Sequence, residues 1–126
     1  MTITEGVKLL THDGSTWLFR DEKGRRYSYK KMTIGSDVFI GTRSIIMPGV
    51  HIGNRVIIGA GSVVTKSIPD GSIVAGNPAR LIGQYEDFEQ KALHDFTSEA
   101  DMVAMSDKTF AERINSIAAT TSKPQL

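Results

Sequence analysis

The sequence contains no cysteine, so a disulfide framework, a thiolate metal site and a cysteine nucleophile are all excluded. Neither sign of charge dominates the 126 residues: 15 Lys and Arg residues stand against 14 Asp and Glu residues, for a formal net charge of +1. This balance argues against a general nucleic-acid binder. No apolar run approaches the roughly 20 residues of a membrane span, and the N-terminus lacks the pattern of a secretory signal. We expect one cytoplasmic domain.

A six-residue repeat runs through the middle of the chain. Aliphatic residues recur at every sixth position, namely Ile34, Ile40, Ile46, Ile52, Ile58 and Val64. Small or β-branched residues mostly follow four positions later, and we place Ile68 among these. Because this period is neither that of a helix nor simple alternation, it predicts a triangular coil. Each hexad forms a short strand and a corner, its lead aliphatic points inward, and three hexads close one coil that stacks in parallel on the next. A β-sandwich, the alternative, usually has looser strand spacing of about 8–12 residues.

The repeat is interrupted by a polar and charged segment, residues 15–33. A solenoid cannot bury such a segment, so we expect it to leave the coil as a long excursion loop. Its aromatic residues argue against plain disorder. They flank Lys23 and Gly24, which makes a hairpin arm possible.

The predicted organisation has three parts. A β-helix domain covers residues 1–83, including the excursion at 15–33, and a C-terminal helical segment covers residues 84–119. Residues 120–126 are expected to form a flexible tail. In the helical segment, one apolar stripe precedes Ser106, and a second helix is expected to start near that residue.

The hexads and two later motifs resemble those of the hexapeptide-repeat acyltransferases. The motifs are Gly59-Ala60-Gly61-Ser62-Val63-Val64-Thr65-Lys66 and Ala75-Gly76-Asn77-Pro78-Ala79-Arg80. The likeness covers roughly residues 2–83 and points to the branch of galactoside, maltose and antibiotic O-acetyltransferases. It implies a mainly-β fold, a left-handed parallel β-helix of hexapeptide repeats, which is a rare exception to right-handed crossovers. It also implies acetyl-CoA as cosubstrate and a homotrimer with sites between subunits.

The resemblance further implies roles for particular residues. His12, where the coil passes into the arm, corresponds to the general base that takes the proton of the acceptor hydroxyl. The backbone at Thr42 and Ala60 corresponds to contacts with the thioester and pantetheine. Thr65, Lys66 and Arg80 correspond to the end of the family's motif, which meets the pantetheine–nucleotide region of the coenzyme.

Each of these assignments has an alternative. His12 could be an ordinary surface histidine, corner geometry alone accounts for Gly59–Ser62, and Lys66 and Arg80 could be solvated surface charges. Trp17 and Tyr29 are candidates for stacking on the acceptor or for packing the arm. No metal site is expected, because the three histidines are not closely paired in the sequence.

We therefore expect an acetyl-CoA-dependent O-acetyltransferase in which His12 activates a hydroxyl of a sugar-like acceptor. N-acetylation of an amino sugar is a close variant. The alternative is a non-catalytic β-helical scaffold or assembly subunit, or an inactive C-terminal fragment of an acetyltransferase. Only two full regular coils run from Ile34 to Pro69, whereas full-length members of the family carry more.

Overall fold

The structure is a computed structural model that describes residues 1–118 and residue 123. The chain divides into two compact units, Met1–Phe88 and Glu89–Leu126, and each is described by itself. The tail predicted at 120–126 lies, apart from residue 123, outside the described residues.

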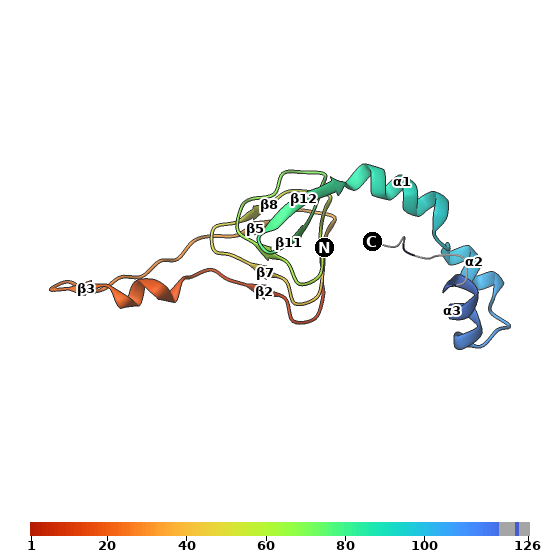
Figure 1. Cartoon of the computed structure of the whole chain (residues 1–126), viewed down its shortest axis with the longest axis horizontal. Helices are drawn as coiled ribbons and strands as arrows, with labels where there is room; N and C mark the ends of the chain where they lie inside the picture. Colours follow the sequence, from red (N-terminus) through yellow and green to blue (C-terminus); the bar gives the residue numbers. More distant parts are fainter. Residues whose placement is uncertain (119–122, 124–126) are drawn as a thin grey trace. The chain divides into compact units, whose positions relative to one another are not determined.

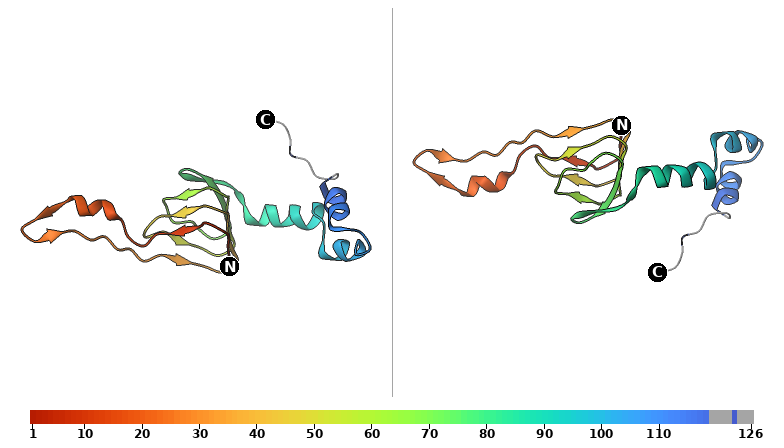
Figure 2. Two further views of the ribbon diagram at one scale, coloured as in Figure 1. Left: turned by 90° about the horizontal axis from the view of Figure 1, so that it is seen from below. Right: turned by 90° about the horizontal axis from the view of Figure 1, so that it is seen from above.

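The first unit is built from short strands in three main sheets. One sheet has the order β1 (Thr2–Ile3), β6 (Val38–Ile40), β9 (Val56–Ile58), β11 (Ser72–Gly76) and β12 (Ala79–Gln84). The second has the order β10 (Val63–Val64), β7 (Ile45–Ile46) and β2 (Lys8–Leu9), and the third pairs β5 (Thr33–Ile34) with β8 (His51–Ile52). All pairs in these sheets are parallel except β11 with β12. From β5 to β11, successive strands fall in different sheets, so the chain winds around a three-sided coil (Figures 1 and 2).

The strand register follows the hexads. Ile40 pairs with Ile58 and Ile46 with Val64, so each residue lies 18 positions from its partner, the length of three hexads. In the first coil Ile3 pairs with Ile40, an offset of 37 positions. The surplus of 19 positions equals the length of the segment at 15–33, which lies between these two coils.

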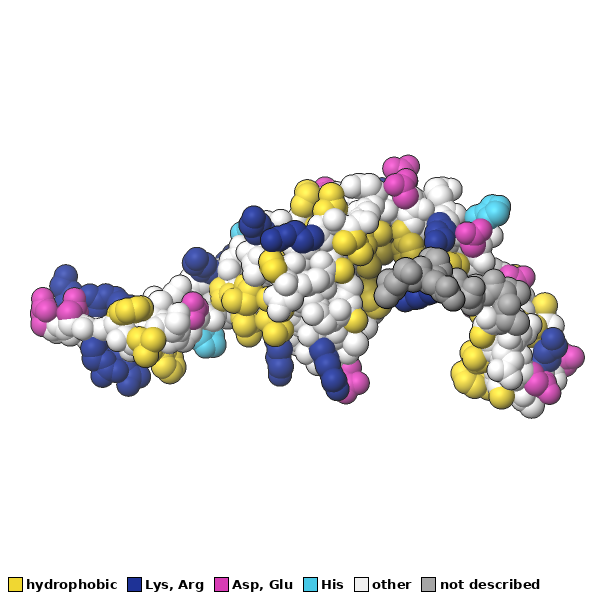
Figure 3. All heavy atoms as spheres, viewed as in Figure 1, with side chains coloured by type: hydrophobic (Ala, Val, Ile, Leu, Met, Phe, Trp, Pro, Cys, Tyr) yellow, Lys and Arg dark blue, Asp and Glu magenta, His cyan; other side chains and the backbone are white. Residues whose placement is uncertain are grey.

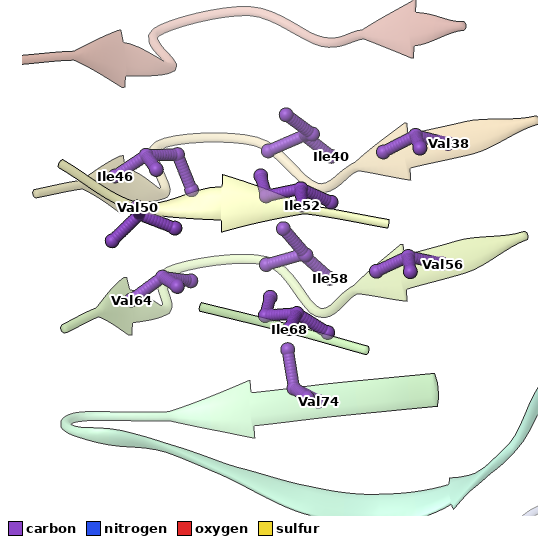
Figure 4. Packing of buried hydrophobic residues seen from close by; sticks show 10 residues of the cluster. All are labelled: Val38, Ile40, Ile46, Val50, Ile52, Val56, Ile58, Val64, Ile68 and Val74. Atoms are coloured by element: carbon purple, nitrogen blue, oxygen red, sulfur yellow. The ribbon is translucent and has the colours of Figure 1, made fainter. Parts of the chain in front are cut away.

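The lead aliphatics form the core of the coil, as predicted. Figure 4 shows them stacked above one another between the strands, and those from Ile40 to Val64 are at most 3% exposed. The residues four positions after the lead aliphatics are buried as well, namely Val38, Ser44, Val50, Val56 and Ser62. In the first coil the lead aliphatics Ile3 and Leu9 are each 41% exposed, since the structure places a coil against only one side of them.

Two buried serines at these positions hydrogen-bond to the backbone. The hydroxyls of Ser44 and Ser62 both donate to the Gly59 carbonyl, at 3.0 and 2.5 Å. The Ser62 hydroxyl also accepts a hydrogen bond from the Gly76 N–H at 3.2 Å. Because a buried polar group without a partner is costly, these bonds explain why serine is tolerated at positions that valine fills elsewhere.

The prediction that Ile68 is one of the residues four positions after a lead aliphatic is wrong. Ile68 bridges to Ile52, and Val74 pairs with Ile58, so both offsets are 16 positions rather than 18. Ile68 therefore occupies the position of a lead aliphatic, four residues after Val64 instead of six. The corner between them is two residues shorter than the corner above it, and the Ser67 hydroxyl closes it by accepting the His51 N–H at 3.0 Å.

The segment at 15–33 forms a hairpin arm that extends away from the coil (Figure 1). It contains a 3₁₀ helix η1 (Gly14–Leu18) and a two-stranded antiparallel ladder of β3 (Arg20–Asp21) and β4 (Gly24–Arg25). None of the residues at 14–33 is buried. The arm is therefore held by local hydrogen bonds rather than by a core of its own.

Within the described residues, the chain continues into three helices, α1 (Tyr85–Asp95), α2 (Glu99–Ala104) and α3 (Phe110–Ala118). Before Ser106, in the region of the apolar stripe, α1 ends and Ser98 starts α2 with a reciprocal capping box to Asp101. None of the helices in the described residues is long and apolar enough to cross a membrane.

Candidate functional site

The root of the arm fixes His12 by backbone pairing. His12 forms an antiparallel bridge with Tyr29. On either side, the Asp13 N–H donates to the Ser28 carbonyl at 3.2 Å, and the Lys30 N–H donates to the Thr11 carbonyl at 2.8 Å. The His12 side chain is exposed, with its ring centre 5.8 Å from that of Tyr29. The histidine is thus held where the arm joins the coil, and its imidazole remains accessible.

Asp13 places a carboxylate next to this histidine. It caps η1 by accepting the Ser15 N–H at 2.8 Å. Hydrogen bonds from the Ser15 backbone and side chain hold the pKa of Asp13 below its usual value, and the positive charge of Lys30 acts in the same direction. Asp13 is therefore ionised at neutral pH.

A cavity of about 230 Å³ lies where the arm meets the coil. Asp13, Ser28 and Lys30 line it from the arm, and Met47, Pro48 and Thr65 line it from the coil. The cavity thus brings the immediate neighbour of His12 together with Thr65, one of the residues that the sequence assigned to the coenzyme.

Thr42 and Ala60 occupy equivalent places in two stacked corners. The Thr42 hydroxyl donates to the Glu5 carbonyl at 2.7 Å, and the Gly61 N–H donates to the Thr42 carbonyl at 2.8 Å. Both residues are exposed, and within residues 1–118 their own N–H groups donate to no other protein group. Two unused amide donors therefore lie one above the other on this edge of the coil.

The corners approach closely at this edge because Gly41 has no side chain. A Cβ at Gly41 would lie 2.7 Å from the Ala60 Cα and 2.8 Å from the Gly59 carbonyl carbon. Both distances are far shorter than ordinary contact. Glycine is therefore required here by backbone proximity, and it keeps the Thr42 and Ala60 corners together.

Lys66 and Arg80 lie in different surroundings. Lys66 and Thr65 line a second cavity, of about 320 Å³, beside β11 and β12. Arg80 is on β12 and exposed, its Nη1 donating to the Ala79 carbonyl at 3.4 Å. Thr65 borders both cavities, whereas Thr42, Ala60, Arg80 and His12 line neither of these two.

The aromatic candidates lie along the arm and include one that the sequence reasoning did not single out. Tyr27 stacks on Tyr29, with ring centres 6.4 Å apart and planes 13° apart, and meets Trp17 edge-on at 6.4 Å. Tyr27 and Tyr29 are two positions apart, the spacing that puts side chains on one side of an extended strand. That spacing is the signal that identifies Tyr27.

The other two histidines do not join His12. The His51 Nδ1 lies 2.7 Å from the Thr33 hydroxyl in a neighbouring coil, and His94 lies on α1 beside Asp95. The described part of the chain contains no group of three or more His, Cys, Asp or Glu side chains that could hold a metal ion.

Comparison with known proteins agrees with the coil. Residues 31–66 match the family model described as bacterial transferase hexapeptide (six repeats). Protein CapG of Staphylococcus aureus is 50% identical over 101 residues, which is 79% of this chain and 59% of CapG.

Two solved structures have similar coils. A galactoside acetyltransferase in complex with coenzyme A is 33% identical with a TM-score of 0.58, covering 78% of this chain and 50% of that one. A maltose O-acetyltransferase from Clostridium difficile 630 is 37% identical with a TM-score of 0.55, covering 65% of this chain and 44% of that one. The chain spans from 44% to 59% of the length of these three relatives.

The family match, at residues 31–66, lies within residues 2–83, where the sequence resembles the hexapeptide-repeat acyltransferases. The mainly-β fold and the parallel coils agree with the left-handed β-helix that the resemblance implied. The coil is therefore similar to those of hexapeptide-repeat acetyltransferases, and residues 31–66 carry the repeats described by the bacterial transferase hexapeptide model.

Proposed function

We propose that this chain transfers the acetyl group of acetyl-CoA to a hydroxyl of a sugar-like acceptor, with His12 as general base. The observation that carries the proposal is the root of the arm, where backbone pairing holds an exposed histidine next to Asp13, which lines a cavity together with Thr65. The names of the two similar solved structures, a galactoside acetyltransferase and a maltose O-acetyltransferase, support the reaction class. An amino group would serve as acceptor by the same route.

In the proposed reaction, His12 removes the hydroxyl proton while the oxygen attacks the thioester carbonyl carbon. The carbon–sulfur bond then breaks, and the leaving sulfur of coenzyme A takes up the proton. A positioned base of this kind contributes about 10²–10⁴-fold to the rate. Asp13, kept ionised by its hydrogen bonds with Ser15, favours the positive charge that His12 acquires during the step.

We assign the coenzyme to the edges of the coil. The unused N–H groups of Thr42 and Ala60 suit the carbonyl groups of the thioester and the pantetheine arm. A donor aimed at a developing oxyanion is worth about 3 kcal/mol. Lys66, beside Thr65 in the second cavity, and the exposed Arg80 supply positive charge for the phosphates.

We also propose that the chain works as a homotrimer in the cytoplasm, with the sites between subunits. An apolar hollow on the coil, lined by residues that include Phe39, Ile57 and Tyr85, supports this assembly. Phe39 is 43% exposed although it lies in the middle of a strand, and a second subunit would cover it.

The test is loss of the acetyl-CoA thioester in the presence of a panel of sugars, for the parent chain and for His12→Ala. The expected result is a drop of at least about 10²-fold in turnover, with acetyl-CoA affinity nearly intact. His94→Ala is the matched control, because His94 is also exposed but lies on α1. Equal turnover in His12→Ala and the parent chain would contradict the assignment of the base.

A further inference from the structure

The arm carries aromatic rings in single file. The file begins at His12 and continues through Tyr29 and Tyr27 to Trp17, with successive ring centres 5.8, 6.4 and 6.4 Å apart. At its far end the guanidinium carbon of Arg25 lies 5.6 Å from the Trp17 ring centre, within cation–π range. The file therefore runs from the proposed general base to a cation.

Packing within the arm does not account for these rings. Trp17, Tyr27 and Tyr29 are 43%, 63% and 68% exposed, and none of the residues at 14–33 is buried. Rings that served only to hold the arm together would be covered by neighbouring side chains. Exposed aromatic side chains gathered in one place, with polar groups around them, are typical of a binding surface.

The arm is also the basic part of the chain. Residues 15–33 contain six Lys and Arg residues and two acids, whereas the rest of the chain contains nine Lys and Arg residues and twelve acids. One of the acids is already paired, since Asp21 accepts from Arg26 at 2.6 Å. Figure 3 shows Lys and Arg side chains gathered at the far end of the arm around a few acidic ones, with hydrophobic side chains beside them.

We infer that the arm binds the acceptor and that this acceptor is an oligosaccharide containing carboxylated sugars. Aromatic faces stack on the apolar faces of sugar rings, and a guanidinium such as that of Arg25 matches a carboxylate with two parallel hydrogen bonds. Several rings in file suit a chain of sugars better than one small ligand. The inference rests on the proposed function for one point only, that the acceptor hydroxyl must reach His12.

The test uses Trp17 as its own probe, because it is the single tryptophan of the chain. The full chain is titrated with tetragalacturonate, with the neutral maltotetraose and with inorganic tripolyphosphate, while tryptophan fluorescence is recorded. We expect a saturable change with tetragalacturonate at a Kd at least about tenfold lower than for either other ligand. This binding should weaken at least about fivefold between about 0.05 and 0.5 M NaCl, since exposed charges are screened.

Substitutions locate the binding on the arm. Arg25→Gln should weaken tetragalacturonate binding about tenfold, and Arg25→Lys should weaken it less, because lysine keeps the charge but not the planar fork. Lys91→Gln, which removes an exposed cation from α1, is the matched control and should bind as the parent does. Equal affinity for maltotetraose, equal affinity for tripolyphosphate, or unchanged binding by Arg25→Gln would overturn the inference.

This titration contains no acetyl-CoA, so it tests binding by the arm independently of the proposed acetyl transfer. Binding of tetragalacturonate without any acetyl transfer would leave the arm assignment standing and remove the proposed function. Acetyl transfer to neutral sugars, with no binding of tetragalacturonate, would support the proposed function and overturn the arm assignment.

Discussion

Replacing Gly41 by alanine should separate the coils at the corner that carries Thr42 and Ala60. The added Cβ would lie 2.7 Å from the Ala60 Cα and 2.8 Å from the Gly59 carbonyl carbon. These are backbone atoms and cannot turn aside as a flexible side chain can. The two corners must therefore move apart by roughly 1 Å to reach normal contact, at a cost of about 1–3 kcal/mol for overpacking.

The same movement would stretch three hydrogen bonds between the coils. Gly41 donates to the Ile58 carbonyl at 2.8 Å, Gly61 donates to the Thr42 carbonyl at 2.8 Å, and the Ser44 hydroxyl donates to the Gly59 carbonyl at 3.0 Å. Each such bond contributes about 1 kcal/mol net. With partial loss of all three, we expect Gly41→Ala to lower the free energy of unfolding by roughly 3–5 kcal/mol.

Urea unfolding followed by circular dichroism measures this change, and amide hydrogen exchange at Gly41 and Gly61 locates it in the coil. The control is Gly14→Ala, where a Cβ would meet no atom within 4 Å. It should change stability by no more than about 1 kcal/mol, in the stabilising direction if at all. Equal urea midpoints for Gly41→Ala and Gly14→Ala would refute the reasoning that the corners are in backbone contact.

Three further predictions concern the core and the second unit. Ile58→Ala, at a fully buried position, should cost about 2–5 kcal/mol in urea unfolding, and Ile3→Ala, 41% exposed, clearly less; equal losses would contradict the burial. Ser62→Ala should cost about 1–3 kcal/mol, because the fully buried Ser62 hydroxyl donates to the Gly59 carbonyl and accepts the Gly76 N–H; a neutral change would show that these bonds contribute nothing. The hydrogen bond to Asp95 raises the pKa of His94, so the pair stabilises α1 below the unfolded pKa of histidine and loses this effect as pH rises through the folded pKa; NMR titration should show His94 titrating higher than in Asp95→Asn.

The coil could be predicted from the sequence because one physical requirement repeats along it. Each lead aliphatic must reach the axis, so the positions from Ile34 to Val64 determine both the strand spacing and the register. The pattern misplaced Ile68, since nothing in the residues 65–67 announces that a corner closes in two residues fewer. Corner length depends on local hydrogen bonds such as that between Ser67 and His51.

The candidate site was less accessible to sequence reasoning. His12, Thr42 and Ala60 were found by resemblance, and no periodicity indicates that His12 lies beside Tyr29 or that Asp13 shares a cavity with Thr65. Those relations depend on how the two strands of the arm pair at its root, which is a contact between residues far apart in sequence. A hairpin was indicated by the aromatics on both sides of Gly24, but the stacking of Tyr27 between Tyr29 and Trp17 was not.

The most direct test of the proposed function is a calorimetric titration of the full chain with acetyl-CoA. The account predicts saturable binding with a Kd below about 1 mM, weakened by Lys66→Glu and left nearly unchanged by His12→Ala. No detectable binding at millimolar acetyl-CoA would contradict the account and favour a β-helical scaffold that lacks the coenzyme site.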